Sequence, residues 1–201
     1  DGESPADDLA AFVAEQQTAK GEFPGPVPVV MAGAVEDALA LAEAKRSGCT
    51  GVVLDLSKLG KDKTSELFKV AGKLGLECLV SVDASAESLK EAGDLGAQLI
   101  IGRSERGADL VDLLKAGAWP DGACKIAACN VGEVRGAWEL RDGGFNAAVL
   151  ANELLYQATV ERVELQSLLK AMRNKGSTKF GKGTSMGRGE GAKEILGTIA
   201  V

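Results

Sequence analysis

Histidine is absent from all 201 residues of the chain. Histidine is the commonest general base, the commonest metal ligand and the side chain that titrates near neutral pH, so the chain cannot use a histidine in any of these roles. Aromatic residues make up only 4% of the sequence, which argues against a surface on which nucleic-acid bases stack. The net charge of −6 disfavours non-specific attraction to nucleic acid or to an anionic membrane. We therefore expect no nucleic-acid partner.

Long apolar runs and paired cysteines are also missing. No stretch of about 18 apolar residues occurs, so the sequence predicts no membrane span, and no signal or transit peptide is recognisable. The four cysteines include no CxxC pair, and each lies in or beside an apolar run: Cys49, Cys78, Cys124 and Cys129. We interpret them as small buried hydrophobic residues in a reducing intracellular compartment, rather than as disulfides or a metal site. We predict no metal and no cofactor.

What the sequence does have is a regular alternation of short apolar runs and amphipathic runs. Hydrophobic residues make up 45%, enough for one α/β domain with a sizeable core. The apolar runs predict strands at residues 27–32, 51–56, 77–82, 97–102, 124–129 and 145–150. The amphipathic runs predict helices at residues 6–17, 35–46, 62–74, 85–94, 107–116, 131–141 and 159–173. Strands that alternate with helices of this length are typical of βαβ units on a parallel sheet.

The composition changes near the C-terminus. Residues 176–191 are rich in glycine, and six Lys or Arg against two acids lie in and just beside this stretch. We interpret residues 1–172 as the folded domain and residues 173–201 as a flexible tail with an apolar end, whose positive charge meets an acidic protein surface. Residues 176–182 have the spacing of a phosphate-binding loop, but Gly183 replaces the required Ser or Thr and a helix precedes it, so a flexible tail is the better interpretation.

Several of these runs resemble a known family. The runs at residues 75–89, 96–102 and 144–155 are similar to the fifth, sixth and eighth strand regions of indole-3-glycerol phosphate synthase, and Val29 to Gly33 fall where its third strand lies. The resemblance covers residues 6–172. It implies an incomplete (β/α)8 TIM-type barrel of about six βα units, without the first two strands and first helix, in a ribulose-phosphate-binding family.

The positions that carry the family's chemistry hold other residues. The lysine of the third strand is missing from Val29–Gly33, and Ser81 replaces the glutamate of the fifth strand. Arg103 stands where the family has an asparagine, Asn130 ends the motif that replaces Glu-Ser-Gly, and Asn152 replaces the glycine that approaches the phosphate. Ring closure needs a lysine acid and a carboxylate at the barrel mouth. The resemblance therefore implies a pseudoenzyme with no catalytic residues.

Polar residues still follow the strands. The candidate ligand-binding residues at the mouth are Asp55, Asp83, Arg103, Ser104, Asn130 and Asn152. Asp55 and Asp83 end neighbouring strands, and two carboxylates could bind Mg²⁺ through oxygen. The same residue types routinely cap helices and solvate loops, which is the interpretation we favour.

Without its first two strands the barrel cannot close, so the predicted strands at residues 27–32 and 145–150 would form two apolar sheet edges. Such edges are templates for association. We predict that the chain binds a protein partner or a second copy through a surface that includes Val29, Met31, Phe145, Ala147 and Val149, with Trp119 as a further interface candidate in a loop.

The predicted function is a non-catalytic structural or assembly subunit of a larger complex. The alternative is an enzyme or sensor that binds a small phosphorylated metabolite at the mouth. The Gly/Ala-rich composition suggests an organelle-imported protein, with the chloroplast stroma as the suspected location.

Overall fold

A computed structural model describes residues 5–21, 25–33, 35–129, 131, 134–150, 156 and 165–173. Two predicted mouth residues, Asn130 and Asn152, lie outside these residues, and so does nearly all of the basic segment at 173–201. None of the described helices is long and apolar enough to cross a membrane.

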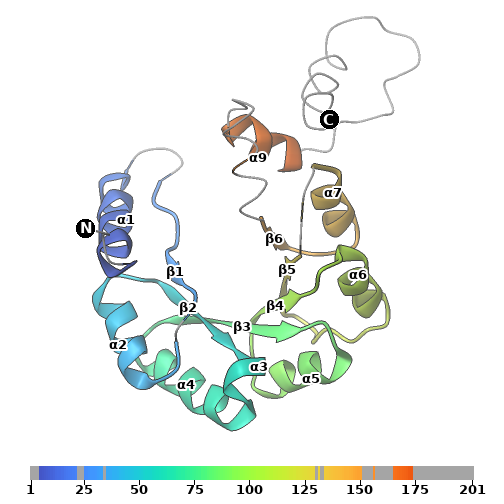
Figure 1. The fold of residues 1–201 in the computed structure, drawn as a ribbon, viewed down its shortest axis with the longest axis horizontal. Coiled ribbons are helices and arrows are strands. Elements are labelled where there is room, and N and C mark those ends of the chain that lie inside the picture. The colour runs from blue at the N-terminus through green and yellow to red at the C-terminus, as the bar shows by residue number, and fades with distance from the viewer. Residues whose placement is uncertain are drawn as a thin grey trace, which may run out of the picture. The chain divides into compact units, whose positions relative to one another are not determined.

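Six strands alternate with helices along the chain (Figure 1). The strands are β1 (Val30–Met31), β2 (Gly51–Asp55), β3 (Glu77–Asp83), β4 (Leu99–Arg103), β5 (Cys124–Ala128) and β6 (Ala147–Val149). The helices are α1 (Pro5–Thr18), α2 (Ala38–Arg46), α3 (Leu56–Leu59), α4 (Lys61–Lys73), α5 (Ala86–Asp94), α6 (Gly107–Lys115), α7 (Val134–Asp142) and α9 (Leu165–Arg173). These elements confirm all six predicted strands and all seven predicted helices, with shorter bounds for β1, β6 and α2, while residues 159–164 of the last predicted helix lie outside the described residues.

The strands lie in the sheet in sequence order, from β1 to β6. The pairs β1–β2, β2–β3 and β5–β6 are parallel. Each crossover between neighbours contains at least one helix, as parallel pairing requires. β1 and β6 are the outermost strands of the sheet that the structure describes.

The chain divides into two compact units, and the boundary falls within β4. Unit 1 comprises residues 1–101 and 120–123, and its core lies between the sheet and its helices. Val52 and Leu54 on β2 are fully buried there, together with Leu41 of α2. α1 joins this core through Val13. A Cβ at Gly48, two residues after the end of α2, would lie 2.6 Å from Val13 Cγ1, so a glycine at this position lets α1 pack here.

Unit 2 comprises residues 102–119 and 124–201. Its buried apolar side chains include Leu110 of α6, Val134 and Leu140 of α7, and Leu168 of α9. α9 packs on α7, where Trp138 Nε1 donates to the carbonyl oxygen of Ala171 at 2.9 Å. Trp138 therefore packs against its own unit, as its place on an amphipathic helix predicts.

All four cysteines are free thiols, and Cys49 and Cys78 are buried. Burial raises the pKa of both of these thiols above the usual value. These two residues are buried as predicted, whereas Cys124 and Cys129 are only half-buried.

Candidate functional site

The site residues of unit 1 follow β2 and β3. Asp55 is the last residue of β2 and also the N-cap of α3, a one-turn helix that the sequence analysis did not predict. Its Oδ1 accepts a hydrogen bond from the backbone N–H of Lys58 at 3.3 Å, and its Oδ2 lies 3.9 Å from Lys58 Nζ. An aspartate at this position satisfies an N–H that the first turn of a helix leaves unpaired. Capping, the favoured interpretation of this carboxylate, is confirmed.

Asp83 ends β3 and is also held by local structure. Its Oδ2 accepts a hydrogen bond of 2.7 Å from the hydroxyl of Ser57 in α3, so this short helix connects the ends of the two strands. The backbone carbonyl of Asp83 accepts from the N–H of Ser85, whose own hydroxyl caps α5. Both carboxylates therefore contact α3, one through the backbone and one through a side chain.

The strand register places Ser81 on the same face of the sheet as the two carboxylates. Asp55 pairs with Ser81 in the parallel ladder, so Asp55, Ser81 and Asp83 share one face of the sheet. Ser81 is buried, with 4% of its surface exposed. A hydroxyl has too high a pKa to act as a general acid or base as a carboxylate does, so this position cannot carry that chemistry.

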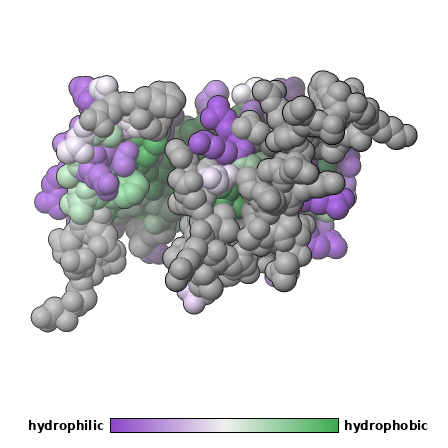
Figure 2. Space-filling view, turned by 90° about the horizontal axis from the view of Figure 1, so that it is seen from above, coloured by the Kyte–Doolittle hydropathy of each residue, from purple (hydrophilic) through white to green (hydrophobic). Residues whose placement is uncertain are grey.

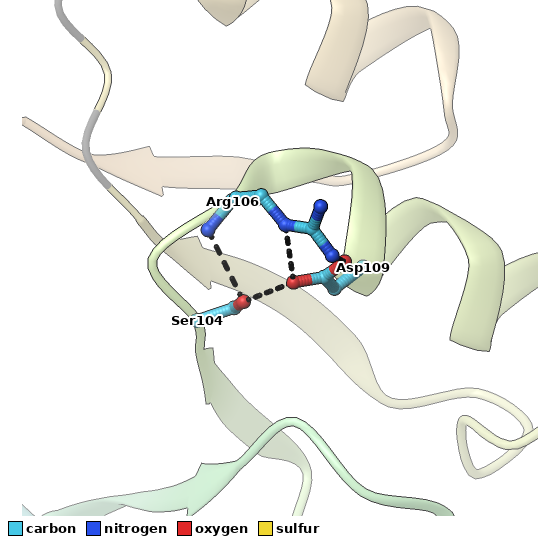
Figure 3. Close-up of polar contacts among 3 residues, drawn as sticks. All are labelled: Ser104, Arg106 and Asp109. Carbon is cyan, nitrogen blue, oxygen red and sulfur yellow. Dashed lines mark hydrogen bonds and ion pairs between the residues drawn. The ribbon is translucent and has the colours of Figure 1, made fainter.

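The polar residues after β4 form a second cluster, in unit 2 (Figure 3). Ser104 Oγ donates to Asp109 Oδ2 at 3.0 Å and accepts from the backbone N–H of Arg106 at 3.2 Å. The guanidinium of Arg106 forms a two-pronged pair with Asp109, with Nη2–Oδ1 at 2.6 Å and Nε–Oδ2 at 3.2 Å. These hydrogen bonds, first from Arg106 and then from Ser104, lower the pKa of the Asp109 carboxyl.

This cluster closes the loop between β4 and α6. Asp109 lies in the first turn of α6, where a negative charge is favoured by the helix dipole. Sequence analysis named Ser104 as a candidate site residue but missed Asp109. The signal that could have found it is the spacing of Arg106 and Asp109, three residues apart at a helix start, which brings the two side chains together.

The remaining mouth residue that the structure describes is Arg103, the half-buried last residue of β4. Within the described part of the chain, no group of three or more Cys, Asp or Glu side chains is placed to hold a metal ion. The contacts that the structure does show for Asp55, Asp83 and Ser104 are to helix starts and βα loops.

The interface candidates divide into buried and exposed residues. Trp119 and Phe145 were expected on an interaction surface, but both are buried within unit 2, at 5% and 6% exposed. Their rings meet edge to face, with centroids 5.2 Å apart. Trp119 is not an exposed loop residue, because its ring fills space left by Gly102: a Cβ there would lie 3.0 Å from the indole.

The face of β1 was also assigned wrongly. Val29 is buried in the core of unit 1, and Met31 packs against the same core. Alternation along the strand instead exposes Val30, at 36%. An apolar run of this kind has no alternation of apolar and polar residues from which its buried side could be assigned.

On β6 the expected surface residues are exposed. Val149 is 47% exposed and Ala147 is exposed as well. The register pairs Ala147 with Ile126 and Val149 with Ala128, and both partners on β5 are half-buried. These four apolar side chains, which we call the β5–β6 face, lie on one side of the sheet. Hydrophobic residues at the molecular surface are coloured green in Figure 2.

Comparisons with known proteins agree with the fold and with the family resemblance. No family model matches the chain. Over 74 residues, or 37% of its length, the chain is 34% identical to the indole-3-glycerol phosphate synthase of Leptospira interrogans serogroup Icterohaemorrhagiae serovar copenhageni (strain Fiocruz L1-130). The matched segment spans 29% of that protein, less than a third of its length.

Two solved structures from Pyrococcus furiosus match over 86% of the chain at 19% identity. One is the tryptophan synthase complex, with a TM-score of 0.63 over 72% of that chain, and the other is a mutant tryptophan synthase alpha-subunit, with a TM-score of 0.62 over 73%. The chain has the fold of an incomplete (β/α)8 TIM-type barrel. Its sequence resembles indole-3-glycerol phosphate synthase, as the strand motifs predict.

Proposed function

We propose that the chain is a non-catalytic subunit that associates, through exposed sheet residues, with another protein or with a second copy of itself. The observation that carries this proposal is the β5–β6 face, where Val149 on an outermost strand is 47% exposed. Exposed apolar side chains on an outer strand favour association, because binding removes them from water and an outer strand can pair with a further strand.

The residues at the strand ends support the non-catalytic part of the proposal. Asp55 and Asp83 accept hydrogen bonds from α3, and Asp109 is paired with Arg106 and Ser104. Carboxylates held in this way by caps and ion pairs stabilise loops and are not positioned to exchange protons with a substrate. The tryptophan synthase complex that shares the fold is itself an assembly of subunits, which makes such a role familiar for this fold.

The association is tested by placing a charge on the β5–β6 face. Val149→Lys should weaken self-association, or binding to an isolated partner, by about tenfold or more, because an interface excludes an unpaired charge from its centre. Leu169→Lys is the matched control, because Leu169 is a similarly exposed apolar residue of the same unit, at 44%, but lies on α9. Equal binding by both variants and the unmodified protein, measured by sedimentation velocity, would contradict the proposed surface.

The absence of catalytic activity is tested separately. We expect no turnover of the anthranilate-derived ribulose phosphate that the resembled family uses, since Ser81 replaces its strand carboxylate. Indole-glycerol phosphate forming above a no-enzyme control, and disappearing in an Asp83→Asn variant, would show that the strand ends retain the chemistry.

The basic segment at residues 173–201 is a second part of the proposal, and it rests on composition. Six Lys or Arg against two acids in and beside this segment favour an acidic protein surface as its partner. Binding through the segment should weaken as salt rises from 50 to about 300 mM, because screening shortens the range of the attraction. A salt-independent affinity would argue against it.

A further inference from the structure

The chain leaves the described part of unit 2 close to the loop that leads into β6. α9 ends at Arg173, whose carbonyl oxygen accepts a hydrogen bond of 3.0 Å from Nη1 of Arg141, in the last turn of α7. α7 ends at Asp142 and β6 begins at Ala147, so the chain between them spans at most about 17 Å when fully extended. Residues 174–201 therefore start near the amino end of β6.

The sequence after Arg173 is a mainly polar stretch followed by a short apolar one. The 21 residues from 174 to 194 include six glycines and five Lys or Arg, a composition typical of a flexible linker. A linker of this length has a root-mean-square span of about 25 Å, and its fully extended length is about 70 Å. Residues 195–201 can thus reach β6 from the end of α9.

Residues 195–201 have the composition of a β-strand. Their sequence is Ile-Leu-Gly-Thr-Ile-Ala-Val, with no charged residue and with four β-branched residues among the seven. β-Branched side chains are enriched in strands, because they pack well on a pleated surface. Alternate residues of a strand lie on the same side, so Ile195, Ile199 and Val201 would all face one way.

β6 is the place in unit 2 where such a strand can be added. Within the described residues, β6 pairs with β5 and is the last strand of the sheet. Val149 is 47% exposed, and Ala147 is exposed as well. A strand added beside β6 would place apolar side chains next to both residues and would form backbone hydrogen bonds with the edge. The exposed apolar surface of β6 would then be removed from water.

We propose that residues 195–201 add to the outer edge of β6 in their own chain and cover Ala147 and Val149 until a binding partner displaces them. The linker makes this contact intramolecular, and a short flexible linker gives an effective concentration of about 1 mM. A second copy at about 1 μM supplies the same residues at a concentration roughly a thousandfold lower. The chain's own residues therefore occupy the edge in preference to those of a second copy.

This contact would regulate the proposed association, and it rests on that proposal for the surface that a partner takes. The β5–β6 face cannot hold residues 195–201 and a partner at the same time. Weakening the contact from the side of residues 195–201 should strengthen association, whereas a charge on Val149 should weaken association. Because the two effects have opposite signs, failure of the contact and failure of the association can be distinguished.

Amide hydrogen exchange of β6 in the full chain, followed by mass spectrometry, tests the contact. Ile199→Lys places a charge in the middle of the added strand and should raise the exchange rate at Ala148 and Val149 by about tenfold or more, because the edge then opens to water. In sedimentation velocity the same variant should bind a second copy or an isolated partner about tenfold more tightly. Met186→Lys, the same kind of substitution within the linker, should change neither result.

Equal exchange rates of β6 in Ile199→Lys and the unmodified protein would overturn the proposal, because residues 195–201 would then not cover the strand. Protection that appears only as the protein concentration rises from about 1 to 100 μM would assign the contact to a second copy and overturn the intramolecular form. If Ile199→Lys exchanges faster while both proteins remain single chains, the contact is supported and the proposed association fails.

Discussion

The indole ring of Trp119 meets the ring of Phe145 edge to face, with centroids 5.2 Å apart and an interplanar angle of 87°. Trp119 lies in the loop after α6 and Phe145 lies two residues before β6, so the contact joins two loops of unit 2. Within the described residues, Trp119 Nε1 is buried with no hydrogen-bond acceptor. The apolar contacts of the ring thus stabilise unit 2. Burial of its N–H group lowers the stability, because no hydrogen bond replaces the one lost to water.

Substitutions of Trp119 should separate these two effects. Trp119→Ala removes the ring and should lower the free energy of unfolding by about 3–5 kcal/mol, the usual cost of emptying such a site. Trp119→Phe keeps most of the apolar contact and removes an unpaired donor whose burial costs about 1–3 kcal/mol. We therefore expect Trp119→Phe to change the stability by less than about 1 kcal/mol in urea unfolding. A large loss in Trp119→Phe would mean that the N–H group has an acceptor.

Asp55 should matter for stability through its cap. Asp55→Ala removes the acceptor for the Lys58 N–H and should lower the free energy of unfolding by about 1 kcal/mol. Asp55→Ser should recover most of this loss, because a serine hydroxyl also caps helices. Asp37→Ala is a matched comparison, since Asp37 caps α2 through a 2.8 Å bond to the Ala40 N–H. If Asp55→Ala unfolded at the same urea concentration as the unmodified protein, the capping role would be wrong.

The Arg106–Asp109 pair should give a measurable pH dependence. The pKa of Asp109 is lowered in the folded state, so the pair's contribution to stability is present above the unfolded value of about 3.9 and is lost as pH falls through the lower folded value. Carboxyl ¹³C NMR should detect the lowered pKa directly. Arg106→Ala should raise it toward the ordinary value, whereas Arg135→Ala, which removes the separate pair with Glu139, should leave it unchanged.

Two glycines of unit 1 should respond oppositely to alanine. A Cβ at Gly51 would lie 2.8 Å from the backbone oxygen of Glu77, so Gly51→Ala must separate β2 from β3. We expect it to cost about 1–3 kcal/mol. Gly72→Ala meets nothing and should stabilise α4 by about 0.5–1 kcal/mol. Thermal unfolding of the two variants shows whether Gly51→Ala lowers the stability and whether Gly72→Ala raises it. An unchanged stability in Gly51→Ala would show that the strands can shift.

The elements could be predicted from the sequence because apolar runs of strand length alternate with helical runs. α3 was missed because four residues are too few to show helical periodicity, although Asp55 before them is a typical cap. The face of β1 could not be predicted, because in Val29, Val30 and Met31 every residue is apolar and only the packed core shows which ones are buried.

The site was predicted less completely than the fold. Residues at the strand ends follow from the positions of the strands, so Asp55, Asp83, Arg103 and Ser104 could be named in advance. Their partners could not, because contacts such as Ser57 with Asp83 depend on how a short helix is placed. Burial of Trp119 depends on Gly102 in another segment, and a sequence gives no measure of such a fit.

The mass of the native particle is the most direct test of the central claim. Light scattering on the protein isolated from its own cells at low micromolar concentration should give a mass well above that of one chain. The same measurement on Val149→Lys should give a smaller particle, while Leu169→Lys should keep the native mass. A single-chain mass for the unmodified protein would contradict the account.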